Sequence, residues 1–319
     1  MPIFDLPLDE LRKYEGCSPR PDDIDDYWDS ALEEMRAVDP VVDIQLAAFQ
    51  VPYAKCYDLT FTGVGGARIY AKLVKPVKAD GKHPAVIGFH GYTFYSHSWM
   101  ELLPYAAAGM TAVSMDCRGQ GGRSEDVGGV KGNTQRGHII RGLEEGPNKL
   151  LYRSIYLDCA QLAGIVMDME DVDESRVGCF GGSQGGALTI ACACLEPRVK
   201  RIAPQYPFLC DFKRVWDMDL DVAAYEEMRE WFRKFDPTHE REEEFYNTLS
   251  YIDLQNMVHR IKAEVLMFTG LMDTICPPST QFAAYNKITS KKDTVIYPDF
   301  NHEHLPGCTE RTMEFMLGL

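Results

Sequence analysis

The chain has 319 residues, of which 45% are hydrophobic, enough to form a large buried core. Its 33 lysines and arginines against 48 aspartates and glutamates give a net charge of −15 at pH 7, which repels phosphate backbones and argues against nucleic-acid binding. Residues 1–7 contain neither a basic nor an apolar segment, and no apolar run is long enough to span a bilayer. We therefore expect no signal peptide and no membrane partner.

The ten cysteines lie mostly within apolar runs, as Cys179, Cys192 and Cys194 do. No two of them form a C-x-x-C pair, so neither a zinc ribbon nor a thioredoxin-type site is indicated. In a chain without an export signal, such cysteines are interpreted as reduced core residues of a cytoplasmic protein.

The first 50 residues are predicted to form a helical lead-in, with a helix at residues 22–35 whose acidic first turn follows a proline. Two alternating runs at 55–61 and 67–74, separated by a glycine-rich turn, predict a β-hairpin. Buried strands are then expected at residues 85–89, 111–115, 176–180, 201–204, 264–268 and 294–297. Because such strands alternate with helices, for example at 154–169, the sequence predicts an α/β fold with a mostly parallel central sheet flanked by helices.

Residues 211–260 interrupt this alternation with a segment rich in charged and aromatic side chains that is typical of helices. We interpret it as a helical insertion that forms either a cap or an oligomer interface. Since the sequence contains no internal repeat and no low-complexity linker, residues 1–319 are predicted to form a single domain that carries this insertion.

The sequence GGSQGG at residues 181–186 directly follows the predicted strand 176–180 and leads into an apolar run, 187–195, typical of a buried helix. Strand, sharp turn and helix are the context in which G-x-S-x-G forms a nucleophile elbow, which makes Ser183 the candidate nucleophile. Gly181 and Gly185 supply room where helix and strand pass closely. The alternative is a glycine-rich turn that contains a serine by chance.

A serine nucleophile needs a base that is oriented by a third group, and in α/β-hydrolases these follow in the order serine, acid, histidine. Asp273 comes just after the strand 264–268 and is the candidate acid, the alternative being a turn aspartate. Six of the eight histidines precede Asp273, so chain order leaves His302 and His304 and does not separate them. Their H-x-H spacing is also compatible with a metal site, but no third ligand pattern accompanies it, and we predict no metal and no cofactor.

Acyl transfer through a tetrahedral intermediate also needs two hydrogen-bond donors for the oxyanion. One candidate is the backbone N–H of Gln184 at the start of the predicted helix, where the helix dipole favours negative charge. The second is the backbone N–H of Tyr92, in the loop that follows the strand 85–89. His90 in the same loop is interpreted as a structural histidine that bonds its own loop.

A polar, glycine-rich loop at residues 116–124 lacks the phosphate-loop pattern. Its Arg118 and Gln120 are expected to tie neighbouring loops together. Arg118-Gly119-Gln120, the GGSQGG sequence and His302-Glu303 together resemble the three signature motifs of carbohydrate esterase family seven, the acetyl xylan esterases and cephalosporin C deacetylases. The resemblance extends from Asp5 to the C-terminus, with supporting stretches at 152–158 and 207–211.

This resemblance implies a serine esterase of the α/β-hydrolase superfamily that removes acetyl groups from acetylated xylo-oligosaccharides and related small acetyl esters through an acyl-enzyme. It implies Ser183, Asp273 and His302 as the triad, which favours His302 over His304. It implies the backbone amides of Tyr92 and Gln184 as the oxyanion hole. It also implies a cytoplasmic homo-hexamer whose active sites face an internal chamber, an enclosure that the insertion at 211–260 would help to shape.

Two other functions stay open on the residues alone. The first is a broad carboxylesterase or peptidase, because one fold supports several substrates. The second is a non-catalytic binding protein of the hydrolase fold, although such proteins usually lack part of the triad.

Overall fold

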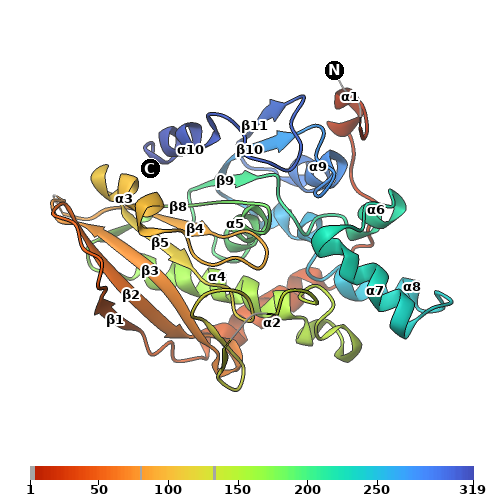
Figure 1. Cartoon of the computed structure of the whole chain (residues 1–319), viewed down its shortest axis with the longest axis horizontal. Coiled ribbons are helices and arrows are strands. Elements are labelled where there is room, and N and C mark those ends of the chain that lie inside the picture. The colour runs from red at the N-terminus through yellow and green to blue at the C-terminus, as the bar shows by residue number, and fades with distance from the viewer. Residues whose placement is uncertain (1–3, 80, 132–133) are drawn as a thin grey trace.

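The computed structural model describes residues 4–79, 81–131 and 134–319, and a nine-stranded sheet runs through its centre (Figure 1). The strands lie in the order β1-β2-β3-β5-β4-β8-β9-β10-β11. Their bounds are β1 Asp43–Leu46, β2 Ala54–Thr62, β3 Arg68–Pro76, β4 His83–Phe89, β5 Thr111–Met115, β8 Val172–Gly182, β9 Arg201–Gln205, β10 Glu264–Gly270 and β11 Lys292–Tyr297. From β5 to β11 all neighbouring strands are parallel, whereas β1, β2, β3 and β5 pair antiparallel. The predicted hairpin and the predicted mostly parallel sheet are therefore confirmed.

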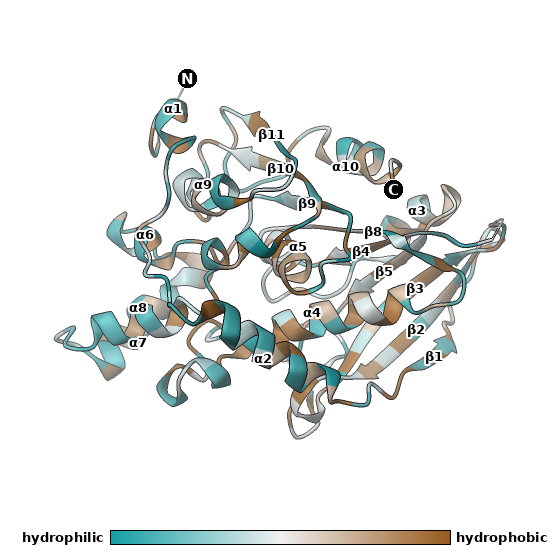
Figure 2. Cartoon of the chain, turned by 180° about the vertical axis from the view of Figure 1, so that it is seen from behind, coloured by the Kyte–Doolittle hydropathy of each residue, from teal (hydrophilic) through white to brown (hydrophobic). Residues whose placement is uncertain are grey.

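Helices cover both faces of this sheet. On one face α2, α4 and α5 join the larger apolar core, whereas α3 and α10 pack on the other face with a smaller one (Figure 1). Their bounds are α2 Ile24–Arg36, α3 Trp99–Ala107, α4 Leu151–Met167, α5 Gln184–Leu195 and α10 Cys308–Met316. Figure 2 shows α4 as a largely hydrophobic helix, while the outer α2 carries hydrophilic residues as well. The parallel strands read as near-continuous apolar runs because both of their faces are buried.

The smaller elements lie at the N-terminus, between β2 and β3, in the loop after β5, and between β10 and β11. They comprise α1 Leu8–Leu11, the two-stranded sheet β6 Glu125–Asp126 and β7 Val130–Lys131, the 3-10 helices Val64–Gly66, Leu143–Glu145 and Pro147–Lys149, and α9 Pro278–Lys287. No helix in the part of the chain that the structure describes is long and apolar enough to cross a membrane.

The prediction of a helical lead-in over residues 1–50 is wrong in its last part, and residues 1–3 lie outside the described part of the chain. Residues 8–11 and 24–36 are helical, but 43–46 form β1, which pairs antiparallel with β2. All four residues of β1 are exposed, so this edge strand has no buried face whose period would mark it as a strand. Main-chain pairing with the free edge of β2 stabilises it instead.

Residues 211–260 are helical, as predicted, and follow the carboxyl end of β9. They contain α6 Phe212–Asp217, α7 Glu226–Phe235, α8 Glu242–Leu249 and the 3-10 helices Ala223–Tyr225, Leu254–Asn256 and Val258–Arg260. Trp231 and Phe232 of α7 pack on Phe245 of α8, with ring centroids 4.8 and 4.6 Å apart. A hydrogen bond of 3.0 Å from Trp231 Nε1 to Glu144 Oε1 anchors α7 to the segment after residue 134. These aromatic residues thus belong to the larger apolar core, which extends into the insertion.

Candidate active site

Ser183 lies between the last residue of β8 and the first residue of α5. Its backbone has φ 57° and ψ −119°, a conformation that L-residues rarely adopt. Three main-chain hydrogen bonds hold it: the Ser183 N–H donates to the Gln205 carbonyl at 3.0 Å, and its own carbonyl accepts from the N–H groups of Ala187 and Phe208 at 3.0 and 3.1 Å. The serine therefore stands on a tight turn whose strain is offset by contacts with β9 and its following loop.

The two glycines that flank the serine lie where main chains approach closely. A Cβ atom on Gly181 would come within 2.6 Å of the Phe89 carbonyl oxygen and of the Gly185 carbonyl carbon. A Cβ atom on Gly185 would come within 2.1 Å of the same Phe89 oxygen. No side chain fits at either position without moving β4 away from α5.

The structure brings Ser183, His302 and Asp273 into one hydrogen-bonded line. His302 Nε2 lies 3.0 Å from Ser183 Oγ, and His302 Nδ1 lies 2.8 Å from Asp273 Oδ2. Asp273 is fully buried, and its other oxygen accepts from the N–H groups of Ile275 and Cys276 at 2.9 and 2.8 Å. With Asp273 accepting from Nδ1–H, the free electron pair of Nε2 faces the serine hydroxyl, which is the arrangement for proton transfer from it.

His304, the other candidate base, is exposed, whereas the His302 side chain is only 19% exposed. Two residues that the sequence analysis did not single out support His302. The Asn301 side-chain oxygen accepts from the His302 and Thr274 N–H groups at 2.8 and 2.9 Å, which ties the histidine loop to the aspartate loop. The Tyr206 ring packs against the imidazole with centroids 4.6 Å apart.

Two backbone N–H groups, those of Gln184 and Tyr92, lie in loops that meet beside the serine. The loops meet because β4 and β8 are neighbours, with Phe89 paired to Gly181 at their carboxyl ends. Gln184 is the first residue of α5, so its N–H has no acceptor within the helix. Among the hydrogen bonds of the described residues, neither of these two N–H groups has an acceptor. Both are thus free to bind an anionic oxygen, and the α5 dipole favours one.

The Gln184 side chain fastens these two loops to α4. It is fully buried and accepts from the Tyr152 hydroxyl at 2.8 Å. It also pairs with the Gln120 amide, with N···O distances of 2.7 and 3.0 Å. Gln120 Oε1 in turn accepts from the N–H of Thr93 at 3.0 Å, next to Tyr92. Gln120 therefore links the loop at 116–124 to both donor loops.

Arg118 of the same loop is buried and makes a bidentate ion pair with Asp158 of α4, with N···O distances of 2.7 and 2.6 Å. Its third nitrogen donates to the Val64 carbonyl at 2.9 Å. The guanidinium thus joins three segments, and it lies in none of the hydrogen bonds of Ser183, His302 or Asp273.

His90 bonds its own loop, through Nδ1 to the carbonyl of the next residue at 2.7 Å, and accepts from the Cys117 N–H at Nε2, at 3.0 Å. Burial lowers the pKa of His90 to about 4, so the imidazole stays neutral and can accept this bond at neutral pH. Its contacts are those of a structural histidine.

Two further polar residues contact the Tyr92 side chain and were missed by the sequence analysis. The Tyr92 hydroxyl lies 2.5 Å from Glu227 Oε1 of α7 and 2.9 Å from His138 Nδ1. None of the other charged residues of α7 is buried, so no sequence pattern marks Glu227 as buried. His138 lies in a segment without regular structure and without a motif.

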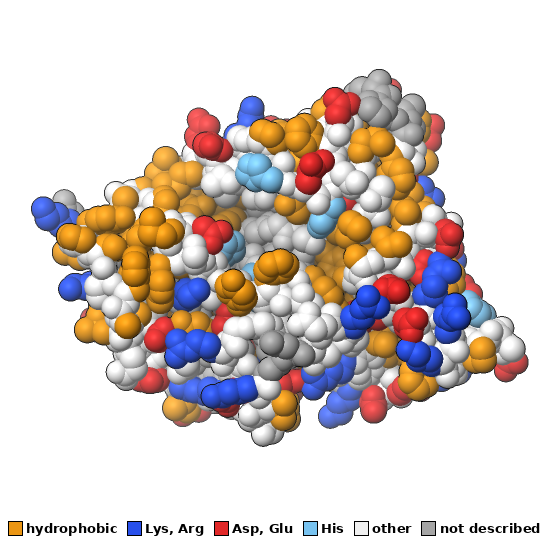
Figure 3. Space-filling model, in the orientation of Figure 1, with side chains coloured by type: hydrophobic (Ala, Val, Ile, Leu, Met, Phe, Trp, Pro, Cys, Tyr) orange, Lys and Arg blue, Asp and Glu red, His pale blue; other side chains and the backbone are white. Residues whose placement is uncertain are grey.

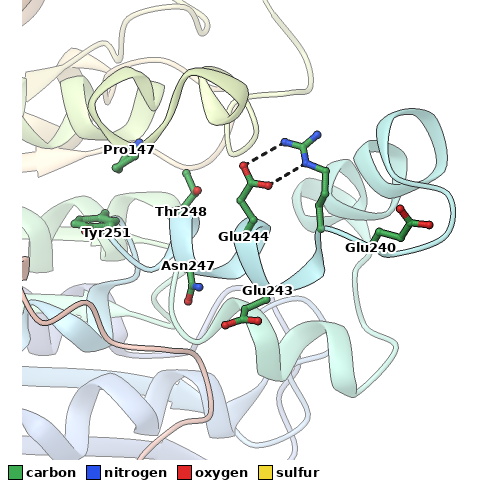
Figure 4. Close-up of a pocket in the computed structure, with 8 residues that line it drawn as sticks. Pro147, Glu240, Glu243, Glu244, Asn247, Thr248 and Tyr251 are labelled. Carbon is green, nitrogen blue, oxygen red and sulfur yellow. Dashed lines mark hydrogen bonds and ion pairs between the residues drawn. The ribbon is translucent and has the colours of Figure 1, made fainter.

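Figure 3 shows a hollow near the middle of the face seen in Figure 1, with histidine and hydrophobic side chains around it. A separate groove of about 520 Å³ lies along α8 and is lined by Pro147, Glu240, Arg241, Glu243, Glu244, Asn247, Thr248 and Tyr251. Figure 4 shows the Glu244 carboxylate paired with a guanidinium there. This ion pair joins Arg241 Nε and Glu244 Oε2, at 3.0 Å. None of the candidate site residues lines this groove.

The whole chain, residues 1–319, matches the family model described as acetyl xylan esterase (AXE1). The chain belongs to this family. It is similar to the crystal structure of acetyl xylan esterase 1 from Thermoanaerobacterium sp. JW/SL YS485, at 58% identity and a TM-score of 0.95 over 99% of each chain. It is also similar to acetyl xylan esterase from Paenibacillus sp. R4, at 36% identity and a TM-score of 0.92 over 98% of this chain and 99% of the other.

Acetyl esterase Axe7A of Xylanibacter ruminicola is 28% identical over 288 residues. That match covers 88% of this chain, and the chain spans 63% of the length of this relative. The predicted family, the α/β-hydrolase fold and the class of carboxylic ester hydrolase are confirmed.

Proposed function

We propose that the protein removes acetyl groups from acetylated xylo-oligosaccharides and related small acetyl esters, cephalosporin C among them, through an acyl-enzyme on Ser183. The observation that carries this proposal is the line of hydrogen-bonded atoms from Ser183 Oγ through His302 to the buried Asp273. Family membership and two relatives named acetyl xylan esterase support an acetylated xylan fragment as the substrate class.

In the proposed reaction, Ser183 Oγ attacks the acetyl carbonyl carbon while His302 Nε2 accepts its proton. Asp273 holds the imidazole in the required tautomer and stabilises the imidazolium. The oxyanion that forms is bound by the backbone N–H groups of Gln184 and Tyr92. His302 then protonates the departing sugar oxygen, which leaves as a hydroxyl as its bond to the acetyl carbon breaks. A water molecule attacks the acetyl-enzyme by the same path and releases acetate. The chain's own residues supply every group in this scheme, and we propose no cofactor.

We further propose that the protein is a single-domain, cytoplasmic enzyme that assembles as a homo-hexamer. Self-association is supported by apolar side chains on and around β1 that are 38–65% exposed: Val41, Val42, Ile44, Leu46, Phe49 and Tyr53. A reducing compartment is supported by ten free cysteines, nine of them buried. Light scattering coupled to gel filtration would give the mass of the assembly directly, and a monomer would contradict the hexamer.

The substrate proposal is tested by measuring acetate release from acetylated xylo-oligosaccharides, sugar peracetates and cephalosporin C. Rates on p-nitrophenyl acetate, p-nitrophenyl butyrate and a proline-containing peptide give the comparison. We expect acetyl esters to be turned over fastest. A preference for the butyrate would indicate a broad carboxylesterase, a preference for the peptide would indicate a peptidase, and either result would overturn the proposal.

A further inference from the structure

The Tyr92 side chain extends from its loop into a buried polar cluster that is formed by distant parts of the chain. Its hydroxyl lies between Glu227 Oε1 at 2.5 Å and His138 Nδ1 at 2.9 Å. His138 is fully buried and Glu227 is 4% exposed. The Tyr92 ring packs edge-on to His138 and against Phe208, whose N–H donates to the Ser183 carbonyl. This side chain thus anchors the loop that carries the proposed second oxyanion donor, the Tyr92 backbone N–H.

The contacts of His138 Nε2 and Glu227 Oε2, on the sides away from Tyr92, determine which atoms carry hydrogen. His138 Nε2 lies 3.2 Å from the Gly119 carbonyl oxygen, and a carbonyl can only accept, so Nε2 carries a hydrogen. Glu227 Oε2 accepts from the N–H groups of Ile139 and Ile140 at 2.7 and 3.2 Å, so it carries none. The two inner contacts, on either side of the Tyr92 hydroxyl, must then each hold one hydrogen atom.

The tyrosine hydroxyl supplies only one of these two hydrogens, so the cluster needs one more. In the first arrangement His138 is a cation that donates to the tyrosine, which donates to a Glu227 carboxylate. In the second, a protonated Glu227 donates to the tyrosine, which donates to neutral His138. Both satisfy every contact, and both contain the same shared proton.

Burial distinguishes the two arrangements. It raises the pKa of Glu227 above the usual carboxyl range, and it lowers the pKa of His138. Both shifts favour the uncharged members of the pair. Burial thus favours the second arrangement, with protonated Glu227 and neutral His138, whereas the N–H groups of Ile139 and Ile140 that bind Oε2 favour the charged carboxylate.

We propose that Glu227, Tyr92 and His138 form a proton-sharing relay that positions the Tyr92 backbone N–H for the oxyanion. The proposal rests on the function proposed above. Glu227 and His138 are positioning residues, because they bond the Tyr92 hydroxyl and take no part in the hydrogen bonds that join Ser183, His302 and Asp273. The relay gives the insertion a role in catalysis, since α7 supplies the carboxyl group that holds the oxyanion loop in place.

The charged groups around the relay are paired with one another. Arg136 is bound to Glu226 at 2.7 Å, and Arg141 to Asp126 at 2.5 Å. The remaining titratable neighbour, Tyr152, is buried and donates to the Gln184 side chain. Because these neighbours are paired with one another, the proton shared within the relay is the titratable group in contact with Tyr92. As pH rises this proton is lost, one inner hydrogen bond breaks, and kcat should fall.

Glu227→Gln provides the sharpest test, because glutamine has the shape of a protonated glutamate. Its amide N–H₂ can donate to the tyrosine while its oxygen accepts from the main chain at 139–140, so every hydrogen bond is retained. We expect kcat on p-nitrophenyl acetate to stay within about twofold of wild type and the fall in kcat at alkaline pH to disappear or move to higher pH. Glu227→Ala and Tyr92→Phe break the relay, and both should lower kcat about tenfold or more with KM nearly unchanged, because a donor to the oxyanion is displaced.

Two control variants separate positioning from general packing. Glu144→Gln alters the other side chain that anchors α7, through Trp231, without reaching Tyr92. Tyr156→Phe removes a buried hydroxyl of α4 that donates to the Ile252 carbonyl at 3.0 Å. Both controls should keep wild-type kcat, and thermal unfolding of all five variants shows whether each is folded.

Three results would overturn the relay: a Glu227→Gln variant as impaired as Glu227→Ala, a Tyr92→Phe variant with wild-type kcat, or an unchanged alkaline limb in Glu227→Gln. None of these would affect the assignment of the nucleophile. That assignment fails separately, if Ser183→Ala retains turnover of p-nitrophenyl acetate.

Discussion

The two proposed oxyanion donors, the backbone N–H groups of Gln184 and Tyr92, are held in place in different ways. Gln184 follows the nucleophile directly, and the glycines that shape its turn lie within residues 181–186, pressed against the carbonyl of Phe89. Tyr92 is held by His138 and Glu227, which lie 46 and 135 residues further along the chain. One donor is set by a short local pattern and the other by tertiary contacts. The comparison suggests that the elbow side is fixed by steric exclusion, whereas the loop side is adjustable through hydrogen bonds.

The largest effect should come from replacing His302, because both donors assist a reaction that starts only when this base activates Ser183. We expect His302→Asn to lower kcat at least about a thousandfold, since members of a triad act as a unit. His304→Asn is the matched control and should stay near wild type, because His304 is exposed and the His302 imidazole occupies the position beside Ser183. Steady-state rates on p-nitrophenyl acetate give both values. A His302→Asn variant with kcat near wild type would remove His302 from the scheme.

A smaller but still large effect should follow from breaking the elbow itself. In Gly185→Ala the new Cβ atom would lie 2.1 Å from the Phe89 carbonyl oxygen, so β4 and α5 must separate. We expect a loss of about 100-fold in kcat from the displaced Gln184 N–H, together with a lower unfolding temperature.

Gly164→Ala is the control for the elbow variant, because it lies within helix α4 and a Cβ atom there meets nothing closer than 3.8 Å. This substitution should raise stability by about 0.5–1 kcal/mol and leave kcat unchanged. If Gly185→Ala behaved like Gly164→Ala, steric exclusion would not be what fixes the elbow.

The sequence predicts the Gln184 side better than the Tyr92 side, because the first depends on a local pattern and the second on tertiary contacts. Buried parallel strands and the G-x-S-x-G turn have local signatures, and the strands, the hairpin and the family follow from them. The sequence does not predict edge strand β1, because all its residues are exposed and its pairing depends on the free edge of β2. The burial of Glu227 is not predicted either, because a glutamate on a charged helix is normally expected to be exposed and only the fold buries it.

The base is an intermediate case between these two. Chain order leaves both His302 and His304, and only the family motif or the three-dimensional path of the last loop separates them. Asn301 and Tyr206, which orient the imidazole, become visible only in the fold.

The smallest expected effect is on the free energy of unfolding in acid, through His90 in the loop that also carries Tyr92. Burial lowers the pKa of His90 to about 4, below its value in an unfolded chain near 6.5. Between these values the unfolded state binds more protons, so the stabilisation is complete above about pH 6.5 and is lost as pH falls towards 4. The loss should approach about 1 kcal/mol per pH unit in urea unfolding curves.

His90→Gln, which has no titratable ring, should show a shallower dependence of unfolding free energy on pH than wild type. The exposed His304→Asn variant should keep the wild-type slope. An unchanged slope in His90→Gln would show that His90 does not set the acid limit of this loop.

The nucleophile is the centre of the account, and covalent labelling tests it most directly. After reaction with diethyl p-nitrophenyl phosphate, the intact protein should gain one phosphoryl adduct per chain in parallel with the loss of esterase activity, and peptide mapping should locate it on Ser183. The Ser183→Ala variant should be folded, inactive and unlabelled. An adduct on another residue that accompanies inactivation, or turnover by Ser183→Ala close to wild type, would contradict the account.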